Sequence, residues 1–149
     1  NVEALGWQRG GISLSWVYDL SAETKIIQPG WFSVSAVGAL KVADGFEVPS
    51  TSARMMMSCF ASSGYYTGFT GRKDIISQEF TIDGHKAFHL RSEIYVSNVP
   101  NVKGDVVDVV VVDTGNPESL AIYFSSATID DAAVQAEVDR ARESIKVGS

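Results

Sequence analysis

Cysteine is nearly absent from this sequence: Cys59 is the only one in 149 residues. A single cysteine can form no internal disulfide and supplies no cluster of thiolate ligands for zinc. Long apolar runs are also missing. The longest, Val106–Val112, is interrupted by Asp108 and is far shorter than the ~20 residues that cross a bilayer. Basic residues are outnumbered, with 12 Lys and Arg against 18 Asp and Glu. Because duplex binding needs a basic face, we expect no nucleic-acid partner.

The composition that remains is that of a globular domain. Hydrophobic residues make up 45% of the chain and charged residues 20%, which excludes a disordered or low-complexity protein. A chain of this length buries a core without the help of a metal or a disulfide, so we expect one domain over residues 1–149. The sequence begins Asn1-Val2-Glu3 without Met or an apolar leader, and we expect a processed or excised piece.

Three segments of the first half have the character of strands. Every second residue from Ile12 to Tyr18 is apolar, so Gly11–Tyr18 is predicted to be a half-buried strand. Trp31–Val37 follows a Pro-Gly turn and predicts a second strand. The short apolar run Arg54–Phe60 suits a buried strand better than a surface one.

The second half predicts a sheet that is covered on both faces. Ile75–Ile82 and His85–Val96 flank Asp83-Gly84, a dipeptide that tolerates the positive φ angles of a type I′ hairpin turn. Both faces of this hairpin carry large apolar side chains. The next run, Val106–Val112, is β-branched at six of its seven positions, which is typical of a central strand between two layers.

The end of the chain predicts a strand and then a helix. Ser119–Ser125 returns along the sheet, and Thr128 is a candidate N-cap. Apolar residues then recur at helical spacing, at Val134, Val138, Ala141 and Ile145, with Gly148 as a stop signal. Glu137 with Arg140, and Asp139 with Arg142, are expected as ion pairs on the outer side. The predicted fold is an α+β antiparallel meander with a long C-terminal helix and a second covering layer.

Candidate catalytic residues are few, and each has a structural alternative. Asp113-Thr114-Gly115 follows two valines, as in aspartic proteases, but that chemistry needs a second carboxylate, and a strand end entering a turn is favoured. His85 and His89 lie four residues apart on a strand, ~13 Å at ~3.3 Å per residue, which is too far for one metal ion. We expect Cys59 to be an inert core thiol, and no metal or cofactor.

The most informative surface candidate is the segment Tyr65–Lys73. It interleaves Tyr65, Tyr66 and Phe69 with glycines and ends in the cations Arg72 and Lys73. Exposed aromatics and Arg are typical of recognition surfaces, so these five residues are the predicted binding residues. In the alternative, Tyr65 and Phe69 cover the sheet as a lid and the two cations are simply solvated.

From Met57 to Val147 the chain resembles the LpqN-like group of exported domains, which have a PsbP-like fold and occur in actinobacterial lipoproteins and single-pass membrane proteins. The resembling pieces are Phe80–Ala87, Val112–Gly115, Leu120–Phe124 and Thr128–Val147. The resemblance implies helices on both sheet faces (an α/β/α sandwich), export, and a membrane anchor N-terminal to the chain. In such relatives a cysteine near Cys59 is often paired.

These observations lead us to expect a non-catalytic binding or accessory domain of a cell-envelope protein, outside the cytoplasm, with another envelope protein or a small ligand as its partner. Two alternatives remain open. One is a small hydrolase using Asp113 or His89, and the other is an NTF2-like domain with a ligand cavity inside a curved sheet.

Overall fold

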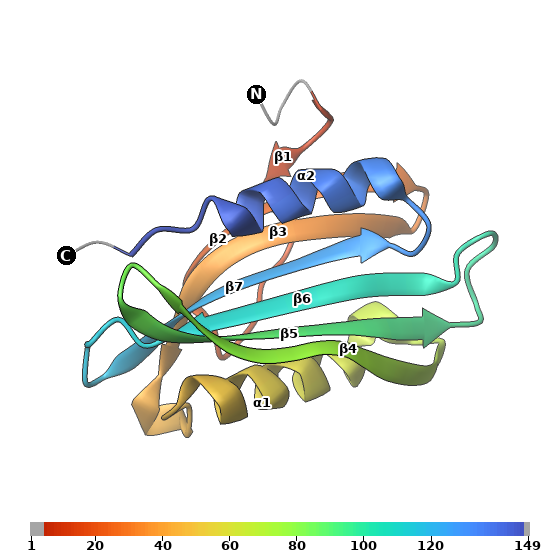
Figure 1. Ribbon diagram of the computed structural model, residues 1–149. Coiled ribbons are helices and arrows are strands. Elements are labelled where there is room, and N and C mark those ends of the chain that lie inside the picture. Colours follow the sequence, from red (N-terminus) through yellow and green to blue (C-terminus); the bar gives the residue numbers. More distant parts are fainter. Residues whose placement is uncertain (1–4, 148–149) are drawn as a thin grey trace.

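The computed structural model describes residues 5–147 and consists of one seven-stranded antiparallel sheet with a helix on each face (Figure 1). The strand order is β1-β2-β3-β7-β6-β5-β4. The strands are β1 (Gln8–Arg9), β2 (Tyr18–Gln28), β3 (Trp31–Lys41), β4 (Phe69–Ile82), β5 (His85–Val96), β6 (Gly104–Val112) and β7 (Ser119–Thr128). The helices are α1 (Pro49–Ala61) and α2 (Ala132–Glu143), and the short 3-10 turns are η2 (Val42–Asp44) and η3 (Gly64–Tyr66). The predicted α+β class and the second covering layer are confirmed.

The β4–β5 hairpin forms as the sequence predicts. Asp83 and Gly84 take φ angles of 51° and 81°, and Ile82 pairs with His85. Strands β4 to β7 form a meander, and β7 then pairs with β3. Helix α1 connects β3 to β4 across one face, so β4 forms the far edge of the sheet (Figure 1).

Strand β6 is central and is buried from both sides, as predicted. Val109 and Val111 belong to the large core under α1, and Val110 and Val112 belong to a smaller core on the α2 face. Alternate residues of an extended strand point to opposite faces. A strand with a covering layer on each side is therefore apolar at nearly every position.

The predicted strand Arg54–Phe60 is wrong, because these residues lie in helix α1. Pro49 occupies the first turn, where its missing N–H is tolerated. The buried residues recur at helical spacing: Ser52, Ala53, Met56, Met57, Phe60 and Ala61. The apolar run from Met55 to Phe60 is shorter than the helix, and only the window from Pro49 onward reveals the helical period.

The predicted strand Gly11–Tyr18 is also wrong. Residues 10–17, which we call the strap, belong to no strand and contain a turn at Ser15-Trp16, and β2 begins only at Tyr18. The strap crosses the α1 face of the sheet, and its Ile12, Leu14 and Trp16 lie partly buried on the core. The predicted alternation of buried and exposed side chains is present. It does not require a partner strand, because a segment that lies along a surface can bury every second side chain without one.

Helix α2 begins later than predicted. Asp131 is the N-cap, and its side chain accepts a hydrogen bond from the Val134 amide, whereas Thr128 ends β7. The pair Asp139–Arg142 forms at 2.8 Å, but it faces the sheet. Glu137 pairs with Lys25 of β2 at 3.2 Å instead of with Arg140. The helix ends at Glu143, earlier than predicted, so Ile145 lies beyond it. Gly148, the expected stop, and the start Asn1-Val2-Glu3 lie outside the described residues.

The arrangement differs from the NTF2-like alternative. That fold places long helices ahead of its strands, whereas within residues 5–147 strands β1 to β3 precede the first helix. Neither helix of the described chain is long and apolar enough to span a membrane.

Candidate functional site: an aromatic cavity with a buried carboxyl group

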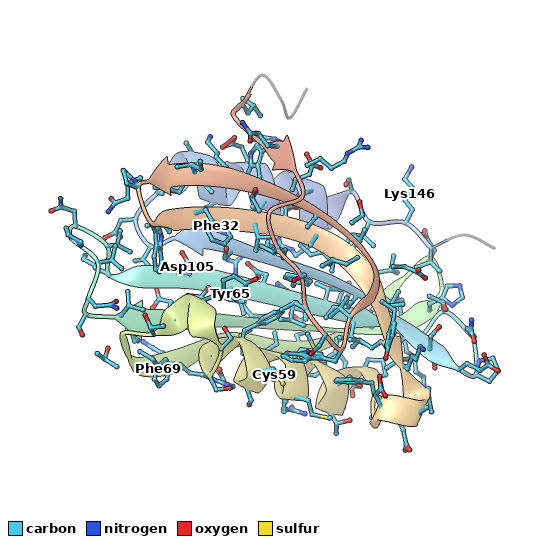
Figure 2. All side chains as sticks on the ribbon, turned by 180° about the vertical axis from the view of Figure 1, so that it is seen from behind. Phe32, Cys59, Tyr65, Phe69, Asp105 and Lys146 are labelled. Carbon is cyan, nitrogen blue, oxygen red and sulfur yellow. The ribbon has the colours of Figure 1, made fainter. Side chains whose placement is uncertain are left out.

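A small cavity of about 70 Å³ lies on the α1 face, between the sheet, the strap and η3. Its walls are mostly apolar and come from strands β3, β6 and β7, from the strap, and from the end of α1 with η3. The lining side chains include Ile12, Leu14, Trp31, Phe32, Val34, Phe60, Tyr65, Tyr66, Asp105, Val107 and Phe124. Figure 2 shows Phe32, Tyr65 and Asp105 gathered in this part of the face.

Six aromatic rings line the cavity, and four of them form two edge-to-face pairs. Trp31 and Tyr66 have centroids 6.2 Å apart at an interplanar angle of 69°, and Phe32 and Tyr65 lie 6.0 Å apart at 85°. Trp31 and Phe32 begin β3, whereas the tyrosines are on η3. Such T-shaped pairs are favoured because the positive edge of one ring meets the negative face of the other. The Trp31 indole N–H is satisfied by the Thr128 hydroxyl at 3.0 Å.

Asp105 is the one carboxyl group among the lining residues, and it is only 2% exposed. Its Oδ2 accepts a 2.7 Å hydrogen bond from the Tyr66 hydroxyl, and its Oδ1 has no hydrogen-bond partner. Burial raises the pKa of Asp105 to about 7, against the opposing effects of the Tyr66 hydrogen bond and of the nearby Trp31 indole N–H, which itself donates to Thr128. Burial also raises the pKa of Tyr66, and the neighbouring Asp105 charge adds to that rise. Near neutral pH the site therefore holds an acid that is poised between its charged and neutral forms.

The strap covers one side of the cavity. Gly10 and Gly11 at its start have φ angles of 89° and 92°, which glycine adopts without strain. The Tyr65 hydroxyl lies 3.5 Å from the Ser13 carbonyl oxygen, and the Trp16 indole N–H contacts the Met56 sulfur at 3.1 Å. These contacts attach the strap to η3 and α1, and a 2.8 Å hydrogen bond from the Gly10 amide to the Ala22 carbonyl oxygen attaches its start to β2.

The five predicted binding residues do not come together. Tyr65 and Tyr66 line the cavity. Phe69 is 45% exposed at the start of edge strand β4 and lies apart from the cavity (Figure 2). Arg72 pairs with Asp74 at 3.3 Å, and Lys73 is exposed. Tyr66 is buried and is therefore not part of an exposed recognition loop. Of the two residues in the lid alternative, Tyr65 borders the cavity and Phe69 does not.

Sequence reasoning missed three cavity residues: Trp31, Phe32 and Asp105. The two aromatics open β3, a strand that was predicted, but nothing in the sequence indicates which η3 residues meet them. For Asp105 a signal existed. A carboxyl group at the start of the valine-rich strand is placed among buried residues and needs an explanation.

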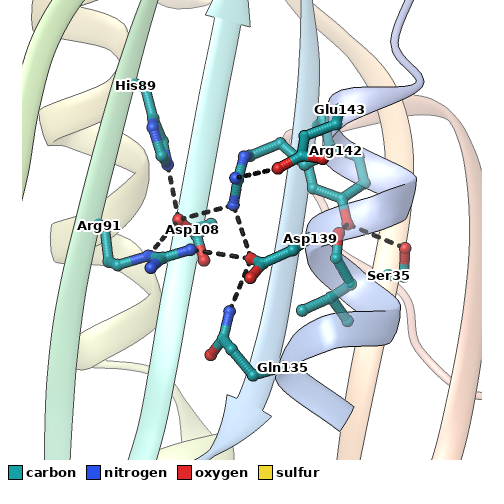
Figure 3. Close-up of polar contacts among 10 residues, drawn as sticks. Ser35, His89, Arg91, Asp108, Gln135, Asp139, Arg142 and Glu143 are labelled. Carbon is teal, nitrogen blue, oxygen red and sulfur yellow. Dashed lines mark hydrogen bonds and ion pairs between the residues drawn. The ribbon is translucent and has the colours of Figure 1, made fainter. Parts of the chain in front are cut away.

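A cluster of charged side chains lies on the opposite face, beneath α2 (Figure 3). Asp108 of β6 is fully buried, and its Oδ1 accepts from His89 Nε2 at 2.6 Å and from Arg91 Nε at 2.8 Å. Arg91 also donates to Asp139 of α2 at 2.9 Å, and Arg142 donates to the same oxygen at 2.8 Å. These contacts join the helix to two strands.

Charge compensation governs the ionisation of Asp108. Burial alone raises its pKa, but the hydrogen bonds from His89 and Arg91 and the Arg91 charge outweigh burial, and the net effect lowers the pKa. His89 also borders a hollow of about 380 Å³ that Phe80 and Arg142 help to line. Among the described residues, no hydrogen bond joins the His89 ring to a serine, threonine or cysteine.

The other candidate residues have structural roles. Asp113 closes the turn after β6: its Oδ1 accepts from the Gly115 amide at 2.9 Å, as Asp does in such turns. His85 contacts the Asp113 carbonyl oxygen at 3.2 Å. Cys59 is free and half-buried on α1. Within residues 5–147, no group of three or more His, Cys, Asp and Glu is arranged to hold a metal ion.

Comparison with solved structures identifies the fold. The chain superposes on the solution structure of cyanobacterial PsbP (CyanoP) from Synechocystis sp. PCC 6803 with a TM-score of 0.60, at 16% identity over 96% of this chain and 82% of that one. The fold is PsbP-like. A Pseudomonas aeruginosa protein of unknown function is also similar, with a TM-score of 0.57 at 12% identity over 96% of this chain and 98% of its own. No family model matches the sequence, and no curated protein is significantly similar to it.

Proposed function

We propose that this protein is a non-catalytic binding domain whose ligand site is the aromatic cavity on the α1 face. The observation that carries the proposal is the chemistry of the lining. Six aromatic rings, several aliphatic side chains and two serines, Ser125 and Ser126, surround one buried carboxyl group, and a mostly apolar lining with few polar groups is typical of a small-molecule site. The PsbP-like fold is compatible with an accessory role and does not by itself identify a ligand.

The same lining argues against a reaction centre at this place. Nucleophilic catalysis needs a nucleophile beside a base, and among the described residues the cavity lining contains no cysteine, lysine or histidine. The Oδ2 of Asp105 is hydrogen-bonded to Tyr66, a weak acid whose pKa is raised further. The hydrolase alternative would have to use His89 on the opposite face, where its Nε2 is engaged by Asp108.

We further propose that the domain acts outside the cytoplasm as part of an anchored cell-envelope protein of the LpqN-like kind. The support is the resemblance of Phe80–Ala87, Val112–Gly115 and the C-terminal helix to that group. Digestion of intact cells by an added protease tests the location: loss of the native protein is expected, and full protection until lysis would contradict the proposal.

Binding is tested by screening neutral, cationic and anionic organic molecules of about four to eight non-hydrogen atoms with ligand-observed NMR. Tyr65 is at the cavity and 42% exposed, so Tyr65→Ala opens the site without removing core. Ile26→Ala is the control, because Ile26 is 74% exposed and is not among the cavity residues. We expect binders whose affinity falls at least about threefold in Tyr65→Ala and is unchanged in Ile26→Ala. The absence of any binder, or an ester hydrolysis activity lost in His89→Gln, would contradict the proposal.

A further inference from the structure

We propose that the cavity takes a small organic ammonium ion, whose –NH₃⁺ group pairs with Asp105 Oδ1 and whose short apolar chain lies against the aromatic rings. This inference rests on the proposed function and names the class of ligand. It follows from three features of the cavity: an uncompensated acid, an aromatic wall and a restricted volume.

The first feature is the missing partner of Asp105. Buried carboxyl groups are normally satisfied on both oxygens, because an unpaired buried polar atom costs free energy. Asp105 Oδ2 receives the Tyr66 hydroxyl, whereas Oδ1 has no donor from the protein although the group is 2% exposed. Asp108, on the other face, also has one oxygen without a partner, Oδ2, but its charge is compensated at Oδ1 by Arg91 and His89. No Lys, Arg or His lines the cavity around Asp105, so a cationic donor would have to come from a ligand.

The second feature is the aromatic wall. Trp31 and Tyr66 form one edge-to-face pair and Phe32 and Tyr65 another. The faces of aromatic rings attract ammonium groups electrostatically, and they also cover alkyl carbons. A carboxylate anion as ligand would face Asp105 with like charge, and a neutral hydrocarbon would leave Oδ1 unsatisfied. The net charge of −6 also favours the approach of a cation.

The third feature is size. A cavity needs about 10–15 Å³ to hold one water molecule, so about 70 Å³ accommodates roughly five non-hydrogen atoms. n-Butylamine has that size. A larger amine would have to place the remainder of its structure beyond the rim formed by Tyr65 and the strap.

The pH dependence of binding distinguishes an ammonium ligand from a neutral one. Tyr65 and Tyr66 are the other titratable side chains lining the cavity, and both are on η3. An ammonium ion pairs with ionised Asp105, so its affinity should rise as the pH passes upward through the pKa of Asp105, about 7. A neutral alcohol of the same length should not gain affinity over that range.

The test compares n-butylamine with 1-butanol, with dissociation constants measured from the Trp31 indole N–H signal in ¹H–¹⁵N NMR spectra. At about pH 8.5 we expect n-butylamine to bind at least about tenfold more tightly than 1-butanol, as for a charge-assisted hydrogen bond. The higher affinity for n-butylamine than for 1-butanol should disappear in Asp105→Asn, and in the wild-type protein it should become smaller at about pH 5.5. Asp113→Asn, in the turn after β6, is the control and should keep it.

Equal affinities of the amine and the alcohol in the wild-type protein would overturn the inference. This comparison needs no variant, so it holds even if Asp105→Asn does not fold. An amine advantage that survives in folded Asp105→Asn would also overturn it. If 1-butanol or another neutral molecule binds at the cavity and the amine has no advantage, the inference fails and the proposed function stands. If no molecule binds there, both fail.

Discussion

The Tyr66 hydroxyl donates a 2.7 Å hydrogen bond to Asp105 Oδ2, and both side chains are buried. The two residues are 39 positions apart. Their contact attaches η3, just after α1, to the start of the central strand β6. The hydrogen bond satisfies one carboxyl oxygen and leaves the other, Oδ1, buried without a partner in a residue that lines the cavity.

The buried acid makes stability depend on pH. The pKa of Asp105 is about 7 in the folded protein and about 4 in an unfolded chain. Between these values the folded state holds more protons than the unfolded state, so the free energy of unfolding falls as the pH rises from about 4 to about 7. Asp105→Asn should remove this fall and make the protein more stable than wild type at about pH 8. Urea unfolding at about pH 5 and about pH 8 measures both effects. A wild-type stability that rises through this range, with no difference in the variant, would contradict the raised pKa.

The free energy of unfolding should fall when Arg91 is removed from the charged cluster beneath α2. Arg91→Met leaves Asp108 fully buried without its closest guanidinium, and breaking a buried pair in this way costs about 3 kcal/mol. We expect a loss of that size in the free energy of unfolding near neutral pH. Arg72→Met is the matched control: the Arg72–Asp74 pair is at the surface, and such pairs contribute about 0–1 kcal/mol. Equal losses in the two variants would show that Asp108 is not held by Arg91.

Gly104 fixes the approach of β6 to β5 immediately before Asp105. Its φ is 145°, and a methyl group there would overlap the carbonyl oxygen of Ile94. Gly104→Ala should therefore destabilise the protein by about 2 kcal/mol or more, because the backbone of β5 has to move. Gly71→Ala has open space around the added carbon and should change stability by less than about 1 kcal/mol. Thermal unfolding of both variants is the measurement, and a Gly104→Ala protein as stable as Gly71→Ala would refute the close approach.

The half of the fold that depends on local signals could be predicted from the sequence. The hairpin turn at Asp83-Gly84 specifies its own register, and the valines of β6 specify a central strand because both faces need apolar cover. Helix α1 was missed because only the apolar run Met55–Phe60 was considered, and that run is too short to show the helical period without the residues from Pro49 onward. The strap was taken for a strand because burial on one side has the same pattern with or without a partner strand.

The candidate site was predicted only in part, because it depends on contacts across long stretches of chain. Tyr65 and Tyr66 were selected for their aromatic character, and both line the cavity. Arg72 and Lys73 were selected for their charge, and Arg72 instead pairs with Asp74 at the surface. Nothing local indicates that Trp31 meets Tyr66 or that Asp105 lies beneath it. The pairing of β3 with β7, and the crossing of α1, bring them together.

The most direct test of this account is the titration of the Asp105 carboxyl carbon by ¹³C NMR, without ligand and with saturating n-butylamine. The account predicts a pKa of about 7 for the free protein and a lower pKa when the ammonium group is bound, because an adjacent positive charge favours the carboxylate. An Asp105 that titrates near 4 in the free protein, or whose pKa is unchanged by the amine, would contradict it.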